Sequence, residues 1–378
     1  MTGPNKVFQI LALCTQRPGQ GLVDARLSAA AADLFSPEFL DAAEHHGLDS
    51  LLFAHVRASG VTTAEAGALD RLRARHVQQS HACAVRQRVI ADVLSATERA
   101  DVRLLVLKGA AFAQLAYADP RLRPMRDVDL LVHKDDLRRA HEILVRHGFS
   151  VGGKAPSPHH HHLPGVSRTV DGATVTIELH GGMLPPTPYL TPLDYEDLAS
   201  TSQRLDLGGV ETRAPAREDL LWHAYAHGFV INTLCPGTLR LISLADVVHG
   251  AEAWVDLIDW DRLRRRYPRL VRALAVVSCV VPWSPKVAAR LGECSRFAKW
   301  PVRPIPVSLA WSSALRADVL WPGEWWFRMR YGVTGLHRWI WYRSVGHPAA
   351  VVRSAARSVM TRMSMRLGTN APQHHLAV

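Results

Sequence analysis

The apolar positions of the chain follow two different patterns. In residues 25–100, a stretch rich in Ala, Leu, Arg and Glu, they recur at helical spacing, for example at 51–56 and 89–94. This spacing predicts several helices. From residue 102 to 107 the pattern becomes a short continuous apolar run, which predicts a buried strand.

Further strands and helices are predicted after this run. A helix is expected at 110–118, a second strand at 127–132 and an amphipathic helix at 134–147. Two more strands, 166–170 and 173–180, flank Asp171-Gly172, a dipeptide typical of two-residue hairpin turns. These two strands should therefore pair antiparallel.

After residue 215 the helical spacing returns, so a sheet of about four strands lies between helical flanks. We expect a mixed α/β (α+β) fold with four regions. The regions are a helical N-terminal region at 1–100, a core holding the small mixed sheet at 101–200, a second helical region at 201–300 and a basic, Trp-rich region at 301–378.

Charge is concentrated at the end of the chain. Of the formal net charge of +11, the residues from 303 onward carry +8, and residues 311–342 hold six of the eleven tryptophans. A basic, aromatic segment suits an anionic partner such as nucleic acid or a membrane surface. Helical spacing of its apolar residues favours packing against the rest of the protein, so both interpretations stay open.

Length and composition indicate a folded protein of more than one packed unit. The chain has 378 residues, of which 48% are hydrophobic and 21% charged. Its five cysteines are widely spaced and form no C-x-x-C pair, which favours reduced thiols in a cytoplasmic protein. The longest apolar run, 273–283, is shorter than the ~20 residues of a membrane span, so no transmembrane segment is expected.

Three carboxylates form the candidate chemistry. Because side chains alternate along a strand, Asp127 and Asp129 should project from one face. Glu178 lies on a neighbouring predicted strand and can face them. Like charges this close need a shared cation, and hard oxygen ligands favour Mg²⁺. This arrangement is typical of two-metal phosphoryl or nucleotidyl transfer, while a solvated strand edge is the alternative for the Asp pair alone.

These residues occur in motifs that resemble a known family. The motifs are LVLKG at 105–109, Tyr117, RLRPMRDVDLLV at 121–132 and IELH at 177–180, supported by AEHHGLDSLL at 43–52, LLWHAYAH at 220–227, Arg240 and Asp246. Together they resemble the uncharacterised nucleotidyltransferase family of the polymerase-beta-like superfamily, over about residues 30–250. The resemblance implies that 101–200 is the catalytic core and that 201–300 completes the cleft.

The resemblance also implies roles for individual residues. Asp127, Asp129 and Glu178 would be catalytic and would bind two Mg²⁺ ions, for which Mn²⁺ can substitute. The nucleotide, an NTP such as ATP, would be bound by four residues: Lys108, Gly109, Arg123 and Arg240. Classical members of the superfamily have Gly-Ser in the phosphate loop. This chain has Lys108-Gly109 there, as the family that it resembles does.

Several basic residues have a plainer alternative. Arg123 can grip a phosphate or be an exposed loop residue, and exposure is favoured for Arg126. The resemblance places Arg240 and Asp246 near the nucleotide cleft. The alternative is that they form an internal salt bridge.

Histidines supply further candidates. Four consecutive histidines at 159–162 can bind a metal, face the substrate or lie on a solvated loop. For His223 and His227, four residues apart, packing and hydrogen bonding are favoured over zinc because the Glu of a metalloprotease motif is absent. His180 is expected beside the site rather than as a ligand.

The sequence therefore predicts a Mg²⁺-dependent nucleotidyltransferase that moves an NMP from an NTP to an acceptor and releases pyrophosphate. The acceptor can be a small molecule, a peptide or protein, or RNA. Two alternatives remain: a toxin-like nucleotidyltransferase acting on RNA, and a non-catalytic nucleotide-binding or partner-binding protein that keeps the fold.

Overall fold

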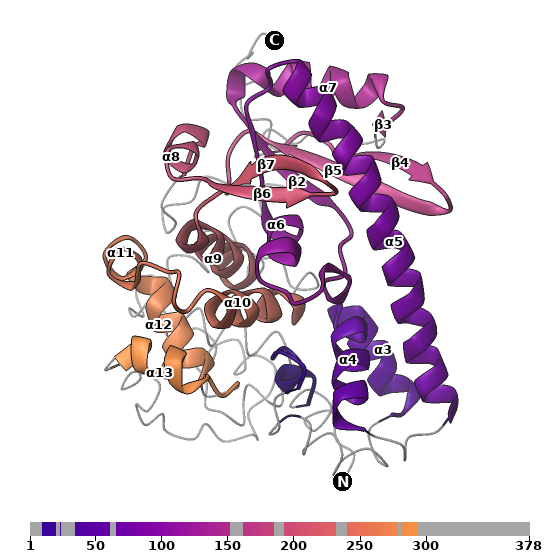
Figure 1. Cartoon of the computed structure of the whole chain (residues 1–378), viewed down its shortest axis with the longest axis vertical. Helices are drawn as coiled ribbons and strands as arrows, with labels where there is room; N and C mark the ends of the chain where they lie inside the picture. The colour runs from indigo at the N-terminus through magenta and orange to yellow at the C-terminus, as the bar shows by residue number, and fades with distance from the viewer. Residues whose placement is uncertain are drawn as a thin grey trace, which may run out of the picture.

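The computed structural model describes eight parts of the chain: residues 10–19, 23, 35–60, 66–151, 162–184, 193–231, 240–278 and 281–292. The predictions for the basic, Trp-rich region at 301–378 and for three of the four consecutive histidines lie outside the described residues. The fold is mixed α/β, as the sequence predicts, with helices on both sides of a central sheet in chain order (Figure 1).

A five-stranded mixed sheet forms the centre, in the order β1-β2-β5-β4-β3. The strands are β1 (Leu104–Val106), β2 (Val128–Val132), β3 (Ser150–Val151), β4 (Val166–Val170) and β5 (Ala173–His180). Only the β2–β5 pair among them is parallel, and the others are antiparallel. The predicted hairpin is confirmed, because Asp171 and Gly172 have φ values of +48° and +75°, the left-handed pair that a type I′ turn requires.

Helices α3 (Pro37–His46), α4 (Asp49–Ser59) and α5 (Ala66–Arg99) precede the sheet in the chain. Ser36 caps α3 by accepting a hydrogen bond from the amide of Phe39, and Gly47 ends it with φ +69°. Figure 1 shows the long α5 running from the α3–α4 pair past the sheet to α7 (Leu137–Arg146). Helices α5 and α7 both pack on β5.

The residues between the strands form short elements. Helix α6 (Lys108–Leu115) follows β1 directly and packs on β2, and it starts two residues before the predicted helix. The short 3₁₀ turns η1 (Pro120–Leu122) and η2 (Lys134–Asp136) stand before β2 and α7 respectively. The connection from β1 to β2 thus holds both the start of α6 and the residues that lead to Asp127.

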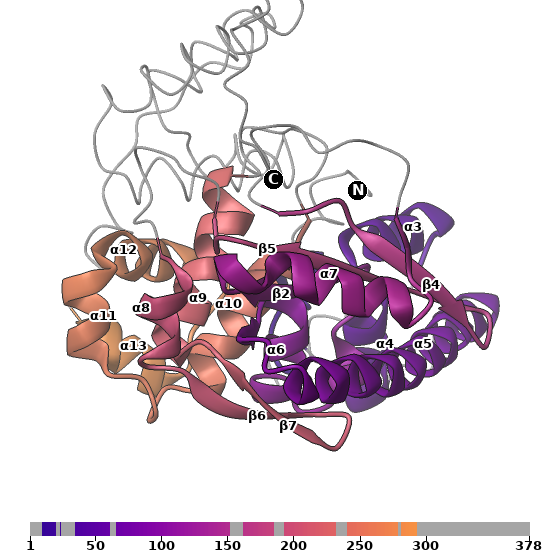
Figure 2. The ribbon, with the colours of Figure 1, turned by 90° about the horizontal axis from the view of Figure 1, so that it is seen from above.

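A second hairpin that the sequence analysis did not predict follows α8 (Tyr195–Ala199). It consists of β6 (Gln203–Leu207) and β7 (Val210–Ala214), joined by Gly208 and Gly209 at φ +68° and +84°. A Cβ at Gly208 would lie 2.5 Å from the carbonyl oxygen of Gln87, so glycine lets this turn approach α5. Figure 2 shows the hairpin beside α5.

The remaining helices form the C-terminal part of the described chain: α9 (Arg217–Tyr225), the π-helical turn η3 (Ala226–Ile231), α10 (Ile242–Ala253), α11 (Trp260–Arg266), α12 (Pro268–Val277) and α13 (Pro285–Leu291). In both views α11, α12 and α13 lie away from the α3–α4 pair (Figures 1 and 2). Helix α10 packs on α6 and α9, which brings it to the connection between β1 and β2.

Buried apolar side chains of all these layers belong to one cluster, which includes Phe39 of α3, Ile177 of β5 and Leu291 of α13. The described elements therefore share one hydrophobic core. In the part of the chain that the structure describes, no helix combines the length and the apolar character that crossing a membrane requires.

Candidate active site

The register of β2 and β5 creates the central feature of the site. Asp129 lies directly opposite Glu178 in the parallel pair, so both carboxylates project from the same face of the sheet. Asp127 precedes the first residue of β2, and it lines the same cavity as Asp129 and Glu178. The structure thus brings together the three carboxylates that the sequence selects.

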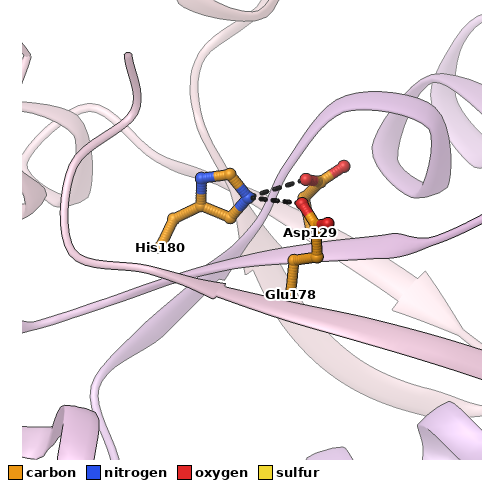
Figure 3. Close-up of side chains that lie close together, drawn as sticks. All are labelled: Asp129, Glu178 and His180. Carbon is orange, nitrogen blue, oxygen red and sulfur yellow. Dashed lines mark hydrogen bonds and ion pairs between the residues drawn. The ribbon is translucent and has the colours of Figure 1, made fainter. Parts of the chain in front are cut away.

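His180 and Lys108 both bind Asp129. The Nε2 atom of His180 lies 2.7 Å from Oδ1 of Asp129 and 3.6 Å from Oε2 of Glu178 (Figure 3). The Nζ atom of Lys108 donates a hydrogen bond of 2.6 Å to the same Asp129 oxygen. His180 therefore lies within the acidic cluster and is fully buried, although it was expected only beside the site.

The chain that precedes β4 approaches His180. His162 forms an isolated β-bridge with His180, and the two rings lie 5.1 Å apart. The Nδ1 atom of His162 is also 4.0 Å from Oε2 of Glu178. His162, the one described residue of the histidine run, therefore lies beside the acidic cluster. The sequence of the run itself does not indicate this position.

The electrostatics of the cluster favour charge on Asp129 and oppose it on Asp127. Burial would raise the pKa of Asp129, but the charge of Lys108 and the hydrogen bond from His180 outweigh it and lower that pKa strongly. The pKa of Asp127 is raised by burial and then by the charges of Asp129 and Glu178. A bound cation would relieve that repulsion.

The three carboxylates line a cavity of about 320 Å³. The first half of the chain contributes to its wall Lys108, Gly109, Phe112, Arg123, Pro124, Met125, Arg126, Asp127 and Asp129. Later residues of the wall are Glu178, Ala224, His227, Arg240, Ile242, Ser243 and Asp246. The seven residues that the sequence analysis assigned to catalysis, metal or nucleotide all line this one cavity.

Lys108 and Gly109 begin α6 at the cavity wall. Lys108 has φ +43°, a conformation that residues other than glycine seldom adopt. No side chain caps the amides of the first turn of α6, and these amides carry the positive end of the helix dipole. A Cβ on Gly109 would lie 3.1 Å from Arg123 and from Met125, so here glycine permits the close packing of Arg123.

The guanidinium group of Arg123 is mostly buried and bonded to other residues of the protein. Its Nε and Nη2 atoms donate hydrogen bonds of 2.8 and 2.7 Å to the two oxygens of Asp246, and Nη1 donates one of 2.5 Å to the carbonyl of Pro124. The exposed alternative is therefore wrong for Arg123. The alternative of an internal salt bridge between Arg240 and Asp246 is also wrong, because Asp246 pairs with Arg123.

Arg240 and Arg126 lie in the same cavity wall. The Nε atom of Arg240 donates a hydrogen bond of 2.8 Å to the carbonyl of His45, in the last turn of α3. The α3–α4 corner, which contains the family-like motif at 43–52, thus positions a residue of the cavity. Arg126 is exposed, as expected, yet it also lines the cavity.

His223 is fully buried in α9, and neither of its ring nitrogens has a hydrogen-bond partner among the described residues. Burial, followed by the charge of Lys108, lowers its pKa well below the usual value, so its ring is neutral. His227 lines the cavity. Neither belongs to a group of metal-ligating side chains within the described chain, where the one such group is Asp129, Glu178 and His180.

Comparison with known proteins identifies the family of this chain. The model of the uncharacterised nucleotidyltransferase family matches residues 36–280, and the chain belongs to that family. No curated protein matches the chain. Among solved structures, the solution structure of the antibiotic-resistance factor ANT(2'')-Ia is similar over 50% of this chain and 95% of that chain, with 14% identity and a TM-score of 0.33.

Proposed function

We propose that the protein transfers an NMP from an NTP, ATP among them, to an acceptor hydroxyl or phosphate and releases pyrophosphate. Membership of a nucleotidyltransferase family supports the reaction class. The observation that carries the proposal is the pairing of Asp129 with Glu178 across β2 and β5, in a cavity that Asp127 also lines.

Magnesium fits this cluster by the chemistry of its donors. Ligand atoms of Asp129, Glu178 and His180 lie within 4.8 Å of one another, and Asp127 adds a third carboxylate to the cavity. Hard carboxylate oxygens favour Mg²⁺, with Mn²⁺ as the alternative. Asp127, Asp129 and Glu178 would hold two such ions, which supply positive charge at the attacking and leaving oxygens.

Residues of the chain contribute directly to the transfer. The acceptor oxygen forms a bond to the α-phosphorus of the NTP, the bond from that phosphorus to the α,β-bridging oxygen breaks, and pyrophosphate leaves with the electron pair. When the acceptor is a hydroxyl, Glu178 takes its proton. The hydrogen bond with His180 lowers the pKa of Glu178 despite burial, so its carboxylate is ionised and able to accept the proton.

Lys108 and the first turn of α6 would bind the α-phosphate. The uncapped amides and the dipole of α6 attract an anion, and the Lys108 ammonium already lies at Asp129. Arg123 serves the site by position, since Asp246 and Pro124 use its guanidinium group. Catalysis would then depend on positioning and electrostatic stabilisation.

The test incubates the full chain with each α-labelled NTP, Mg²⁺ and candidate acceptor extracts, and measures labelled product and pyrophosphate. Asp129→Asn should lower turnover by about 10²–10³-fold while the protein stays folded. Asp70→Asn is the matched control, because Asp70 is an exposed carboxylate of α5 that is not among the residues lining the cavity. Equal turnover in the two variants, or full turnover with EDTA, would refute the proposal.

A further inference from the structure

Two arginines of the cavity wall, Arg126 and Arg240, carry charges that the described protein does not neutralise. Within the described ranges, Arg126 forms no hydrogen bond or ion pair, and Arg240 forms one hydrogen bond, to the carbonyl of His45. The other two cations of the wall differ, because Arg123 is paired with Asp246 and Lys108 with Asp129.

Arg240 is held in place by the end of α3. Its Nε atom binds the His45 carbonyl, and a Cβ at Gly47 would lie 2.6 Å from its Nη2 atom. Gly47 has φ +69° and ends the helix, so the absence of a side chain there serves both the turn and the approach of Arg240. Among the described residues Nη1 and Nη2 of Arg240 form no hydrogen bond, so both can bind a ligand in the cavity that Arg240 lines.

Arg126 and Arg240 act on each other as like charges. Burial is the main reason that the pKa of Arg240 falls to about 10, and the charge of Arg126 is the next, ahead of Arg123. Carboxylates that oppose this effect, Asp49 and Asp127, contribute less. Two guanidinium groups that repel each other at a cavity wall suit an anion between them.

Resting on the proposed function, we propose that Arg126 and Arg240 form a subsite for the pyrophosphate portion of the NTP, its β- and γ-phosphates. The carboxylates and Lys108, which line the same cavity, would bind the reacting α-phosphate. Guanidinium forks match phosphate oxygens and bind them by two hydrogen bonds each. The pair would also hold the pyrophosphate product until it leaves.

The subsite would connect three regions of the chain. Arg126 precedes Asp127 and β2, Arg240 precedes α10, and the carbonyl that orients Arg240 belongs to α3. Occupancy by a diphosphate would therefore stabilise the approach of the α3–α4 corner and α10 to the sheet. This follows because the ligand binds only when these elements are together.

The experiment measures binding rather than turnover, using calorimetry on the full chain with inorganic pyrophosphate and, separately, a nucleoside monophosphate. Arg126→Ala and Arg240→Lys should each weaken pyrophosphate binding by at least ~10-fold and change monophosphate binding less than ~2-fold. Arg138→Ala is the control, since Arg138 is 86% exposed on α7, and it should change neither. Because Arg126 is exposed, its replacement tests the subsite without loss of folding.

Two results would overturn the subsite. The first is an unchanged affinity for pyrophosphate in both variants. The second is an equal weakening of pyrophosphate and monophosphate binding, because that result would place the arginines at the α-phosphate or the nucleoside. Failure of the proposed function has a different signature. If pyrophosphate binding depends on the two arginines but no NTP is turned over, nucleotidyl transfer is refuted and the subsite stands. If NTP is turned over but pyrophosphate binding does not depend on the arginines, the subsite is refuted and nucleotidyl transfer stands.

Discussion

Arg123 and Asp246 form a two-bond salt bridge at the cavity wall, although one precedes β2 and the other lies in α10. Their side chains are 12% and 8% exposed, and the hydroxyl of Tyr117 donates a further hydrogen bond of 2.9 Å to Asp246. The pair therefore ties the segment that leads to Asp127 to the helical region after the sheet.

Replacement of Asp246 by Ala should destabilise the protein by about 3–5 kcal/mol, because Arg123 would keep a buried charge without its carboxylate. Urea denaturation followed by circular dichroism measures this loss. As a control, Asp256→Ala breaks a pair with Lys286 in which both side chains are more than half exposed, and it should leave the midpoint nearly unchanged.

A double variant separates the charge from the packing. Arg123→Met with Asp246→Leu removes both partners and should recover most of the stability that Asp246→Ala loses. If Asp246→Ala alone is as stable as the wild type, the salt bridge contributes nothing and the link between the two regions lies elsewhere.

Gly109→Ala should cost about 1–3 kcal/mol and weaken NTP binding, because the added methyl group would meet Arg123 and Met125 at 3.1 Å. Arg123 has little freedom to move, since all three of its nitrogens are hydrogen-bonded. Gly67→Ala is the matched control: Gly67 lies in a helix and a Cβ there meets nothing within 4 Å. It should be neutral or slightly stabilising, and equal effects of the two changes would contradict the packing argument.

The carboxylates of the site could be predicted from the sequence because the pattern is local. Asp127 and Asp129 are two residues apart at the start of β2, so alternation predicts that they share a face, and the Asp171-Gly172 turn fixes β4 against β5. The pairing of Glu178 with Asp129 then needs only that β5 lies beside β2. Alternation alone assigns these residues no role, and the roles predicted for them rest on the motifs that resemble the family.

Contacts between distant segments could not be predicted in this way. Nothing near Arg123 in the sequence indicates that Asp246 is its partner, and nothing near Arg240 indicates the carbonyl of His45. The contact of His180 with His162, in the chain before β4, is a further example. The β6–β7 hairpin did carry a local signal, the Gly208-Gly209 dipeptide, which favours a two-residue turn.

Stability should fall as the pH drops below about 6.5, and His249 is one source. Burial lowers the pKa of His249 to about 3, so the folded state holds a neutral ring while the unfolded chain takes up a proton near pH 6.5. This histidine should contribute about 1.4 kcal/mol of lost stability for each pH unit between roughly 6 and 4.

His249→Phe tests this contribution. Phenylalanine preserves the stacking on Tyr117, where the ring centroids lie 4.1 Å apart, and it removes the titrating group. Denaturation at pH 7 and at pH 4.5 should show a smaller loss for the variant than for the wild type. An identical pH dependence would mean that His249 does not titrate between the two states.

Mg²⁺ and an NTP together should raise the melting temperature by more than the sum of their separate effects. The ammonium of Lys108 lies 2.6 Å from the Asp129 oxygen that would bind a cation, so the metal alone must compete with it. A nucleotide phosphate gives Lys108 another anionic partner and so lowers the cost of that exchange. Ligands that bind only the folded state stabilise it by about 2.7 kcal/mol at a hundred times their dissociation constant.

Differential scanning fluorimetry with EDTA, Mg²⁺, NTP and both ligands measures the excess. Asp127→Asn should lose the part of the shift that depends on the metal, because it removes a carboxylate whose charge a cation would relieve. Lys108→Met should instead increase the shift with Mg²⁺ alone, since no ammonium remains to compete at Asp129, and should reduce the shift with NTP. Additive shifts in the wild-type protein, or a metal effect unchanged by Lys108→Met, would show that Lys108 and the cation occupy separate positions.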